Sequence, residues 1–411
     1  MNYYDARETR YPLDRERELL ARLPKQVAHA KAHAPAFAAL LADVNPAARV
    51  SREALAGLPV VRKSELLELQ KGARPFGGFA AVKWGTGCAR VFASPGPIYE
   101  PEGARKDYWR LARAFYAAGF RAGDLVHNTF SYHFTPAGSM TETAAHALGC
   151  TVFPAGVGQT EQQVAAMLDL RPDAYAGTPS FLRIILDKAD ELGVKIDSLT
   201  KAFVSGEAFP PSQCEALVAR GIQAFQAYAT ADIGLIAFET PAREGLVLDE
   251  DILLEIVRPG TGEPVAPGEV GEVVVTSFNP DYPLIRFGTG DLSAVLPGAS
   301  PCGRSNTRIK GWLGRADQTT KVKGMFVHPG QVVAVLKRHP EIGRGRLVVD
   351  NPDHTDRMTL HCEVAAPAEG LAEALAGSIR ELTKLRGEVR FCAPGSLAND
   401  GKVIDDVRKY E

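Results

Sequence analysis

The sequence contains no run of 18 consecutive apolar residues among its 411 positions, and we therefore expect no helix that spans a membrane. Its first twenty residues are polar and charged and lack the apolar core of a signal peptide. Lysine and arginine number 47 and aspartate and glutamate 49, so the net charge is only −2. A charge this small gives no indication of nucleic acid or an anionic membrane as a partner.

Cysteine is sparse and dispersed. The six cysteines form no C-x-x-C pair and are Cys88, Cys150, Cys214, Cys302, Cys362 and Cys392. In a chain of this length such spacing is typical of reduced, mostly buried thiols in a cytoplasmic protein. It also predicts no structural zinc, because a zinc site normally needs four ligands.

Two common enzyme signatures are missing as well. No G-x-S-x-G segment occurs, and "GTPSFL" at 177–182 lacks the second glycine of that motif, which argues against a hydrolase. No G-x-G-x-x-G segment opens a helix, which argues against a dinucleotide-dependent dehydrogenase.

The residues that are present predict two domains. In the first half of the chain, β-rich runs such as "GCTVFPA" and "QAFQAYAT" alternate with helical runs, among them 104–118 and 160–170, which predicts an α/β sheet covered on its faces. Two strand-like runs within 252–279, joined by Gly/Pro turns, predict a β-hairpin subdomain. The end of the chain is typical of a small α+β domain, and we place the two domains at residues 1–316 and 317–411.

Four polar segments carry residues suited to chemistry. They are 228-YATADIG-234, 286-RFGTGDLS-293, 314-GRADQTTKVKG-324 and 396-SLANDGKVIDDVR-408. Asp232 in the first could hold Mg²⁺ through its hard oxygen atoms. A lysine on a mobile loop, as in the last, can stabilise negative charge as it develops. Each segment also has a plainer interpretation, as a polar turn, a common Gly-Asp turn, a charged linker or a solvated lysine.

Taken in order, these segments resemble the phenylacetate–coenzyme A ligase-like family of the adenylate-forming superfamily. "SGEAFPP" at 205–211 resembles the adenine-site segment of that family, and "YATAD" resembles its Y-G-x-T-E motif with Asp232 in place of glutamate. "FGTGD" resembles its Y-R-T-G-D motif, "GRADQTTKVKG" its hinge motif and "NDGK" its catalytic-lysine loop. The resemblance implies nucleotide contacts from Ser94, Ser205, Gly206, Glu207, Tyr228, Ala229, Thr230, Asp291, Arg315, Lys323 and Gly324, a hinge at Asp317, and catalytic roles for Asp232 and Lys402.

The resemblance also implies the reaction and its cofactors. A carboxylic acid would react with ATP in the presence of Mg²⁺ to give an acyl-adenylate, and CoA would then receive the acyl group and release AMP. The mobile C-terminal domain would turn about Asp317 between the two half-reactions, so that one site serves both. A homodimer is implied at the level of the family. The relatives that carry a Cys/His zinc cluster near the β-hairpin subdomain differ here, since 238–255 contains neither residue type.

One segment departs from the family pattern. Where relatives would have a Ser/Thr/Gly-rich phosphate loop, this chain has 92-FASPGPIYEPEG-103, which keeps only Ser94 and Gly96. Its three prolines have no N–H to donate, and Glu100 is expected to repel phosphate. Three interpretations stay open: ATP binds with help from Mg²⁺ and other charges such as Arg105 or Lys106, the enzyme performs only the thioester-forming half, or the protein binds an adenylate or CoA without catalysis.

The acid would lie against 131-SYHFTPAGSMTETAAHALG-149. Tyr132, His133 and Phe134 could wall an apolar pocket, with Gly177 and Thr178 at its floor, although aromatic residues after a strand more often belong to the core. An aromatic or medium branched acid is expected. The rivals are a non-catalytic nucleotide or CoA binder and an enzyme that transfers the acyl group to a carrier-protein thiol.

Overall fold

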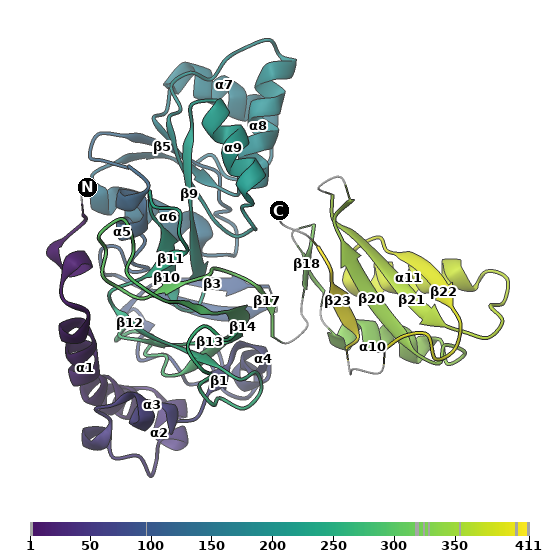
Figure 1. Ribbon diagram of the computed structural model, residues 1–411, viewed down its shortest axis with the longest axis horizontal. Helices are drawn as coiled ribbons and strands as arrows, with labels where there is room; N and C mark the ends of the chain where they lie inside the picture. Colours follow the sequence, from purple (N-terminus) through teal and green to yellow (C-terminus); the bar gives the residue numbers. More distant parts are fainter. Residues whose placement is uncertain are drawn as a thin grey trace. The chain divides into compact units, whose positions relative to one another are not determined.

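A computed structural model describes residues 3–95, 97–316, 320–323, 325–327, 329–352, 355–398 and 402–408. The chain forms two compact units, Met1–Leu313 and Gly314–Glu411, each of which is described by itself (Figure 1). The domain boundary expected from the sequence, after residue 316, lies next to this division. Within the described ranges, no helix has the length and apolar character that crossing a membrane requires.

The first unit is built around a nine-stranded sheet. In the order in which they lie side by side, its strands are β15 (Val295–Leu296), β16 (Arg308–Ile309), β11 (Leu246–Leu248), β10 (Gly234–Glu239), β9 (Gln223–Thr230), β8 (Lys201–Val204), β7 (Ala174–Gly177), β5 (Leu125–Asn128) and β6 (Thr151–Phe153). Neighbours from β6 to β9 run parallel, and those from β9 to β15 run antiparallel.

Helices cover both faces of the parallel part, as the alternating pattern predicts. They are α5 (Ala112–Ala117), α6 (Ala137–Leu148), α7 (Thr160–Leu170), α8 (Pro179–Glu191) and α9 (Pro211–Ala219). On β8, Phe203 belongs to the core cluster that contains α5 and α6, whereas Ala202 and Val204 belong to the cluster that contains α7, α8 and α9. Successive strand residues therefore face opposite helical layers. Figure 1 shows α7, α8 and α9 gathered on one side of the strands.

Helix α5 is shorter than the predicted helix at 104–118. Asp107 and Arg110 adopt positive φ angles of 47° and 64°, a conformation that ends helical geometry for a residue with a side chain. The Asp107 carboxylate accepts hydrogen bonds from the backbone N–H of Ala112 at 3.2 Å, and the helix begins there. The prediction of a helix over the whole stretch is therefore wrong for its first half.

A second sheet and the N-terminal helices form another core. The strands, in sheet order, are β1 (Val61–Arg62), β14 (Phe287–Ser293), β13 (Gly271–Ser277) and β12 (Ile252–Val257). The helices are α1 (Pro12–His33), α2 (Pro35–Leu40), α3 (Arg52–Ala56) and α4 (Lys63–Gly72). Strands β12 and β13 pair antiparallel, which confirms the predicted β-hairpin subdomain. A separate sheet consists of β2 (Lys83–Trp84), β3 (Gly87–Ser94) and β4 (Ile98–Gly103).

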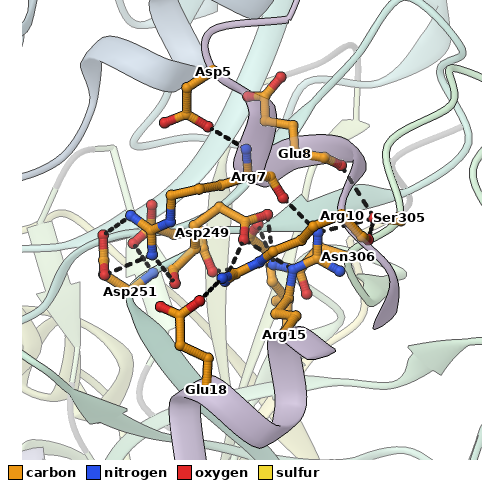
Figure 2. Close-up of polar contacts among 12 residues, drawn as sticks. Asp5, Arg7, Glu8, Arg10, Arg15, Glu18, Asp249, Asp251, Ser305 and Asn306 are labelled. Atoms are coloured by element: carbon orange, nitrogen blue, oxygen red, sulfur yellow. Dashed lines mark hydrogen bonds and ion pairs between the residues drawn. The ribbon is translucent and has the colours of Figure 1, made fainter. Parts of the chain in front are cut away.

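The start of the chain is held to the first unit by buried ion pairs, which Figure 2 shows. Arg7 and Arg22 both contact the Asp251 carboxylate, and Arg15 donates to Glu250 at 2.9 Å. Glu8 meets Arg113 at 3.0 Å and Arg304 at 3.1 Å. Because each of these carboxylates meets two or more guanidinium groups, burying its charge is compensated.

The second unit is a small α+β fold. Its four-stranded sheet has the order β22 (Glu388–Cys392), β21 (Arg357–Glu363), β20 (Gly345–Asp350) and β23 (Ile404–Asp406), with helices α10 (Pro329–Arg338) and α11 (Leu371–Thr383). Apolar residues of both helices and the sheet form one core. Three further short strands precede α10: β17 (Gly314–Arg315), β18 (Thr320–Val322) and β19 (Met325–Val327), of which β18 and β19 pair with each other.

Candidate active site

Two of the predicted nucleotide segments meet in the first unit. The Tyr228 hydroxyl, on β9, donates to Oδ2 of Asp291 at 2.8 Å and lies 3.1 Å from Oγ1 of Thr289, both on β14. The indole N–H of Trp312 donates to the other Asp291 oxygen at 3.1 Å. The carboxylate is therefore held between two aromatic donors. Tyr228 thus forms one polar corner with residues 61 and 63 positions further along the chain.

The carboxyl ends of the parallel strands provide a second part of the site. Ser205, at the end of β8, donates its N–H to Gly177 at 3.2 Å and its hydroxyl to the Ala227 carbonyl at 2.8 Å. Gly206 has a φ of 81°, and an added Cβ there would make ordinary van der Waals contact with Phe130 and Thr178 at 3.9 Å. Ligands of open α/β sheets bind outside the carboxyl ends of the strands. Glu207 follows with an exposed side chain.

Gly177 shows why its position needs glycine. A Cβ at this residue would overlap the hydroxyl groups of Thr129 and Tyr175, which hydrogen-bond to each other at 2.7 Å. Thr178 caps α8 by accepting a hydrogen bond from the N–H of Phe181 at 3.3 Å. The segment after β7 is therefore fixed by tight packing and by a helix cap.

Asp232 lies in the turn between β9 and β10 and is 2% exposed. One of its oxygens, Oδ2, forms an ion pair with the ammonium group of Lys63, the first residue of α4. The other oxygen, Oδ1, is buried and has no hydrogen-bond partner among the described residues. Lys63 was missed from the sequence, because it lies 169 residues before Asp232 and in no motif.

Ser94 and Glu100 lie on the antiparallel strands β3 and β4. Ser94 ends β3 and is 6% exposed, while Glu100 on β4 is completely buried. Both the N–H and the hydroxyl of Ser94 donate to the Glu100 carboxyl group, the N–H at 3.2 Å. Burial, together with the nearby charge of Asp232, raises the pKa of Glu100 to about 8, although Lys63 opposes the rise.

This environment bears on the expectation that Glu100 repels phosphate. Burial raises the pKa of Glu100 and so favours its neutral form, which would repel phosphate less than a charged carboxylate does. The two cations proposed to replace the missing lysine are placed as follows. Arg105 already donates to Asn279 at 2.5 Å and to Asp281 at 3.1 Å, and Lys106 is exposed. Lys63 is the cation that the structure places beside Asp232.

The three side chains predicted to wall the acid pocket, Tyr132, His133 and Phe134, differ in their hydrogen bonding and exposure. The Tyr132 hydroxyl donates to Glu142 at 2.8 Å and accepts from Asn128 at 2.8 Å. His133 and Phe134 are exposed, Phe134 by 81% and with a φ of 61°. The Phe134 carbonyl accepts a hydrogen bond from the N–H of Ala93 at 2.8 Å, which ties this segment to β3.

The remaining predicted residues belong to the second unit. Lys323 has a φ of 47°, and its N–H donates to Asp356 at 2.8 Å. Arg315 lies on β17, and its side chain is half-buried. The Lys402 side chain is 53% exposed, with its ammonium group 3.9 Å from Asp405. Several positions of the predicted motifs lie outside the described residues: Gly96, the hinge residue Asp317 with Gln318 and Thr319, Gly324, and Asn399, Asp400 and Gly401 of the "NDGK" segment.

The part of the chain that the structure describes contains no cluster of three or more His, Cys, Asp or Glu side chains arranged for a metal ion. Mg²⁺ often needs only one or two carboxylates, because phosphates and water supply its other ligands. The unpartnered Oδ1 of Asp232 fits that single role. The residues present therefore suit a cation that arrives with a phosphorylated ligand.

The chain is similar to known proteins over most of its length. Residues 106–279 match the family model described as AMP-binding enzyme. The chain is 31% identical over 405 residues to a phenylacetate–coenzyme A ligase of Aromatoleum evansii, covering 92% of this chain and 90% of that protein. It is 32% identical over 364 residues to the phenylacetate–coenzyme A ligase of Thermus thermophilus, covering 84% of this chain and 80% of that one.

Solved structures show the same architecture. The crystal structure of 2-hydroxyisobutyryl-CoA ligase in complex with 2-HIB-AMP and CoA, in the thioesterification state, matches with a TM-score of 0.81 at 25% identity. The match covers 98% of this chain and 92% of that one. This likeness confirms the predicted fold class.

Proposed function

This chain belongs to the phenylacetate–coenzyme A ligase-like family of AMP-forming acid–thiol ligases, and we propose that its substrate is an aromatic carboxylic acid, activated in the corner around Asp291 and Asp232. The observation that carries the proposal is the convergence of Tyr228, Asp291 and Trp312. The aromatic character of the acid rests on the relatives named above, whose printed substrate is phenylacetate.

The adenosine part of ATP would be held by groups that are already positioned. The Asp291 carboxylate would accept hydrogen bonds from the ribose hydroxyls, and its aromatic donors keep it from rotating. The adenine ring would lie against the backbone at Ser205 and Gly206, beyond the end of β8. These groups do not need to reorganise when the nucleotide binds, which lowers the cost of binding.

The α-phosphate would lie beside Lys63 and Asp232. The Lys63 ammonium group supplies a positive charge in a mostly buried setting, where electrostatic stabilisation is stronger than in water. Asp232 would hold Mg²⁺ through Oδ1, and the ion when bound would neutralise phosphate charge. The carboxylate oxygen of the acid would attack the α-phosphorus as the bond to pyrophosphate breaks.

The second unit would supply Lys402 for the first half-reaction. Lys402 would be withdrawn from the site before the second half-reaction. Its exposed side chain, on a segment that leads into β23, is available to approach a ligand. The thiol of CoA would then attack the acyl carbon of the adenylate, and AMP would leave. The turn of this unit about Asp317 and the contacts of Arg315, Lys323 and Gly324 are part of the proposal and rest on the resemblance alone.

The direct test is to incubate the purified protein with Mg-ATP, CoA and a panel of acids, and to measure both AMP and acyl-CoA. We expect AMP and a new thioester in equal amounts with phenylacetate or another aromatic acid. Absence of AMP release with every acid, from protein that is folded by circular dichroism, would contradict the proposal. AMP release that needs a carrier-protein thiol in place of CoA would reassign the acceptor and leave the adenylation step intact.

A further inference from the structure

In the β3–β4 hairpin, the carboxyl group of Glu100 accepts the hydrogen bonds that Ser94 could otherwise donate to a phosphate. Ser94 offers two donors, its N–H and its hydroxyl, and both point to Glu100. Pro95 and Pro97, which lie between the two strands in sequence, have no N–H to add. Both donors of Ser94 are therefore already in use.

The position of Glu100 is fixed by its neighbour two residues on. Glu102 accepts hydrogen bonds from Trp109 at 2.8 Å, from Ser139 at 2.7 Å and from Arg90 at 2.5 Å. Alternate residues of a strand face the same side, so Glu100 and Glu102 enter the interior together. Anchoring Glu102 thus keeps Glu100 against Ser94.

We propose that Glu100 is a specificity-determining residue that occupies the subsite for the β- and γ-phosphates, so that this chain binds an adenylate in preference to a triphosphate. The inference rests on the proposed function, because it takes the corner of Asp291 and Asp232 as the nucleotide site. A carboxyl group and a phosphate oxygen compete for the same two donors of Ser94. The triphosphate therefore binds only when Glu100 gives up these hydrogen bonds, whereas AMP and an acyl-adenylate leave them in place. The raised pKa of Glu100 is consistent with a carboxyl group held in a buried site.

The test measures the affinities for AMP and for Mg-ATP by calorimetry at pH 7 in the full chain. We expect Glu100→Ala to raise the ratio of ATP affinity to AMP affinity by about tenfold or more, since two donors to a charged ligand are released. Glu100→Gln keeps the side-chain volume and an acceptor for Ser94, and we expect its ratio to stay within about twofold of the wild type. A Ser94→Ala change added to Glu100→Ala should remove part of the gain, because it deletes the hydroxyl and leaves the backbone N–H.

Ser94→Ala alone keeps the inference testable if Glu100→Ala does not fold. We expect this variant to bind ATP as tightly as the wild type or more tightly, because the lost hydroxyl served Glu100. If the Ser94 hydroxyl instead binds phosphate directly, Ser94→Ala should lose ATP affinity several-fold. That result would overturn the inference. If Glu100→Ala leaves the ratio of ATP affinity to AMP affinity unchanged and still binds AMP, the inference is contradicted and the proposed function is not. A wild-type protein that binds neither nucleotide contradicts the proposed function as well.

Discussion

The first unit contains two buried clusters of acidic side chains, and they are paired differently. In the N-terminal cluster, Arg7 and Asp251 form an ion pair that Figure 2 shows, and Arg22 also contacts Asp251. Although burial acts in the opposite direction, hydrogen bonds and charge from both arginines hold the pKa of Asp251 well below its ordinary value. In the hairpin cluster, Glu100 and Asp232 share one lysine, and the pKa of Glu100 rises to about 8 through burial.

This difference in pairing indicates that the N-terminal cluster stabilises the fold, whereas the hairpin cluster takes part in binding. Carboxylates that are fully matched by arginines stabilise the fold and have little capacity left for a ligand. A buried carboxylate with an unpartnered oxygen, such as Oδ1 of Asp232, is costly until a ligand or a cation meets it. We therefore expect mutations in the first cluster to change stability and mutations in the second to change binding.

The largest effect is expected from Arg15→Ala. This change leaves Glu250, which is 1% exposed, with one guanidinium partner fewer and removes the hydrogen bond to Ser305 at 2.9 Å. Breaking a buried ion pair in this way costs about 3–5 kcal/mol of unfolding free energy. Urea denaturation followed by circular dichroism measures the loss. The matched control is Arg17→Ala on the same helix, whose ion pair with Asp14 is exposed and should contribute little. Equal losses of unfolding free energy for Arg15→Ala and Arg17→Ala would show that the buried ion pair stabilises the fold no more than the exposed one.

The next effect is expected on rate alone. Lys402→Ala should slow formation of the acyl-adenylate by about 10²–10³-fold, because it removes one cation that stabilises the transition state. Its stability should not change, since the side chain is largely exposed. Single-turnover AMP formation and thermal unfolding report the two quantities separately, and Lys337→Ala, another exposed lysine of the same unit, is the control. An unchanged rate would show that Lys402 does not act in adenylation.

A smaller effect is expected from Asp291→Asn. Losing the charge that accepts the ribose hydrogen bonds should weaken AMP binding roughly tenfold to a hundredfold, measured by calorimetry. Tyr228→Phe should weaken it less, because Trp312 still holds the carboxylate. If Asp291→Asn bound AMP like the wild type, the polar corner would not be the ribose site.

The last prediction concerns the sign of a pH dependence. Glu100 has a pKa above its ordinary value of 4.5, so the wild type loses stability as pH rises from about 4.5 to about 8. The stability of Glu100→Gln relative to the wild type should therefore rise across that window.

Asp251 has a lowered pKa. It contributes stability at pH values above its ordinary pKa of 3.8, and this stability is lost as the pH falls below that value. The deficit of Asp251→Asn should accordingly shrink in acid. Urea denaturation between pH 3 and 9 checks both signs, and parallel curves would show that the two clusters do not differ.

Local pattern predicted much of this molecule. The alternation of β-rich and helical runs predicted the α/β fold, and the two Val-rich runs before residue 279 predicted the pairing of β12 with β13. The segments that meet at Tyr228 and Asp291 were identified from their order and residue types. These features depend on neighbours in sequence or on segments whose residue types and order resemble a known family.

The features that were missed depend on pairing across long distances. Lys63 lies in an ordinary helix start and gains its role only because α4 packs near the β9–β10 turn. Glu100 was expected to repel phosphate, and its complete burial on β4 could not be predicted from the segment alone. The first half of the predicted helix at 104–118 is lost because Asp107 and Arg110 adopt positive φ angles.

The measurement that tests the central claim most directly is a calorimetric titration of the wild-type protein at pH 7 with AMP and, separately, with Mg-ATP. The claim is that the under-paired carboxylates mark a nucleotide site whose phosphate donors are already committed to Glu100. It predicts that AMP binds and that Mg-ATP binds no more tightly than AMP. Mg-ATP binding many times more tightly than AMP, or no binding of either nucleotide, would contradict it.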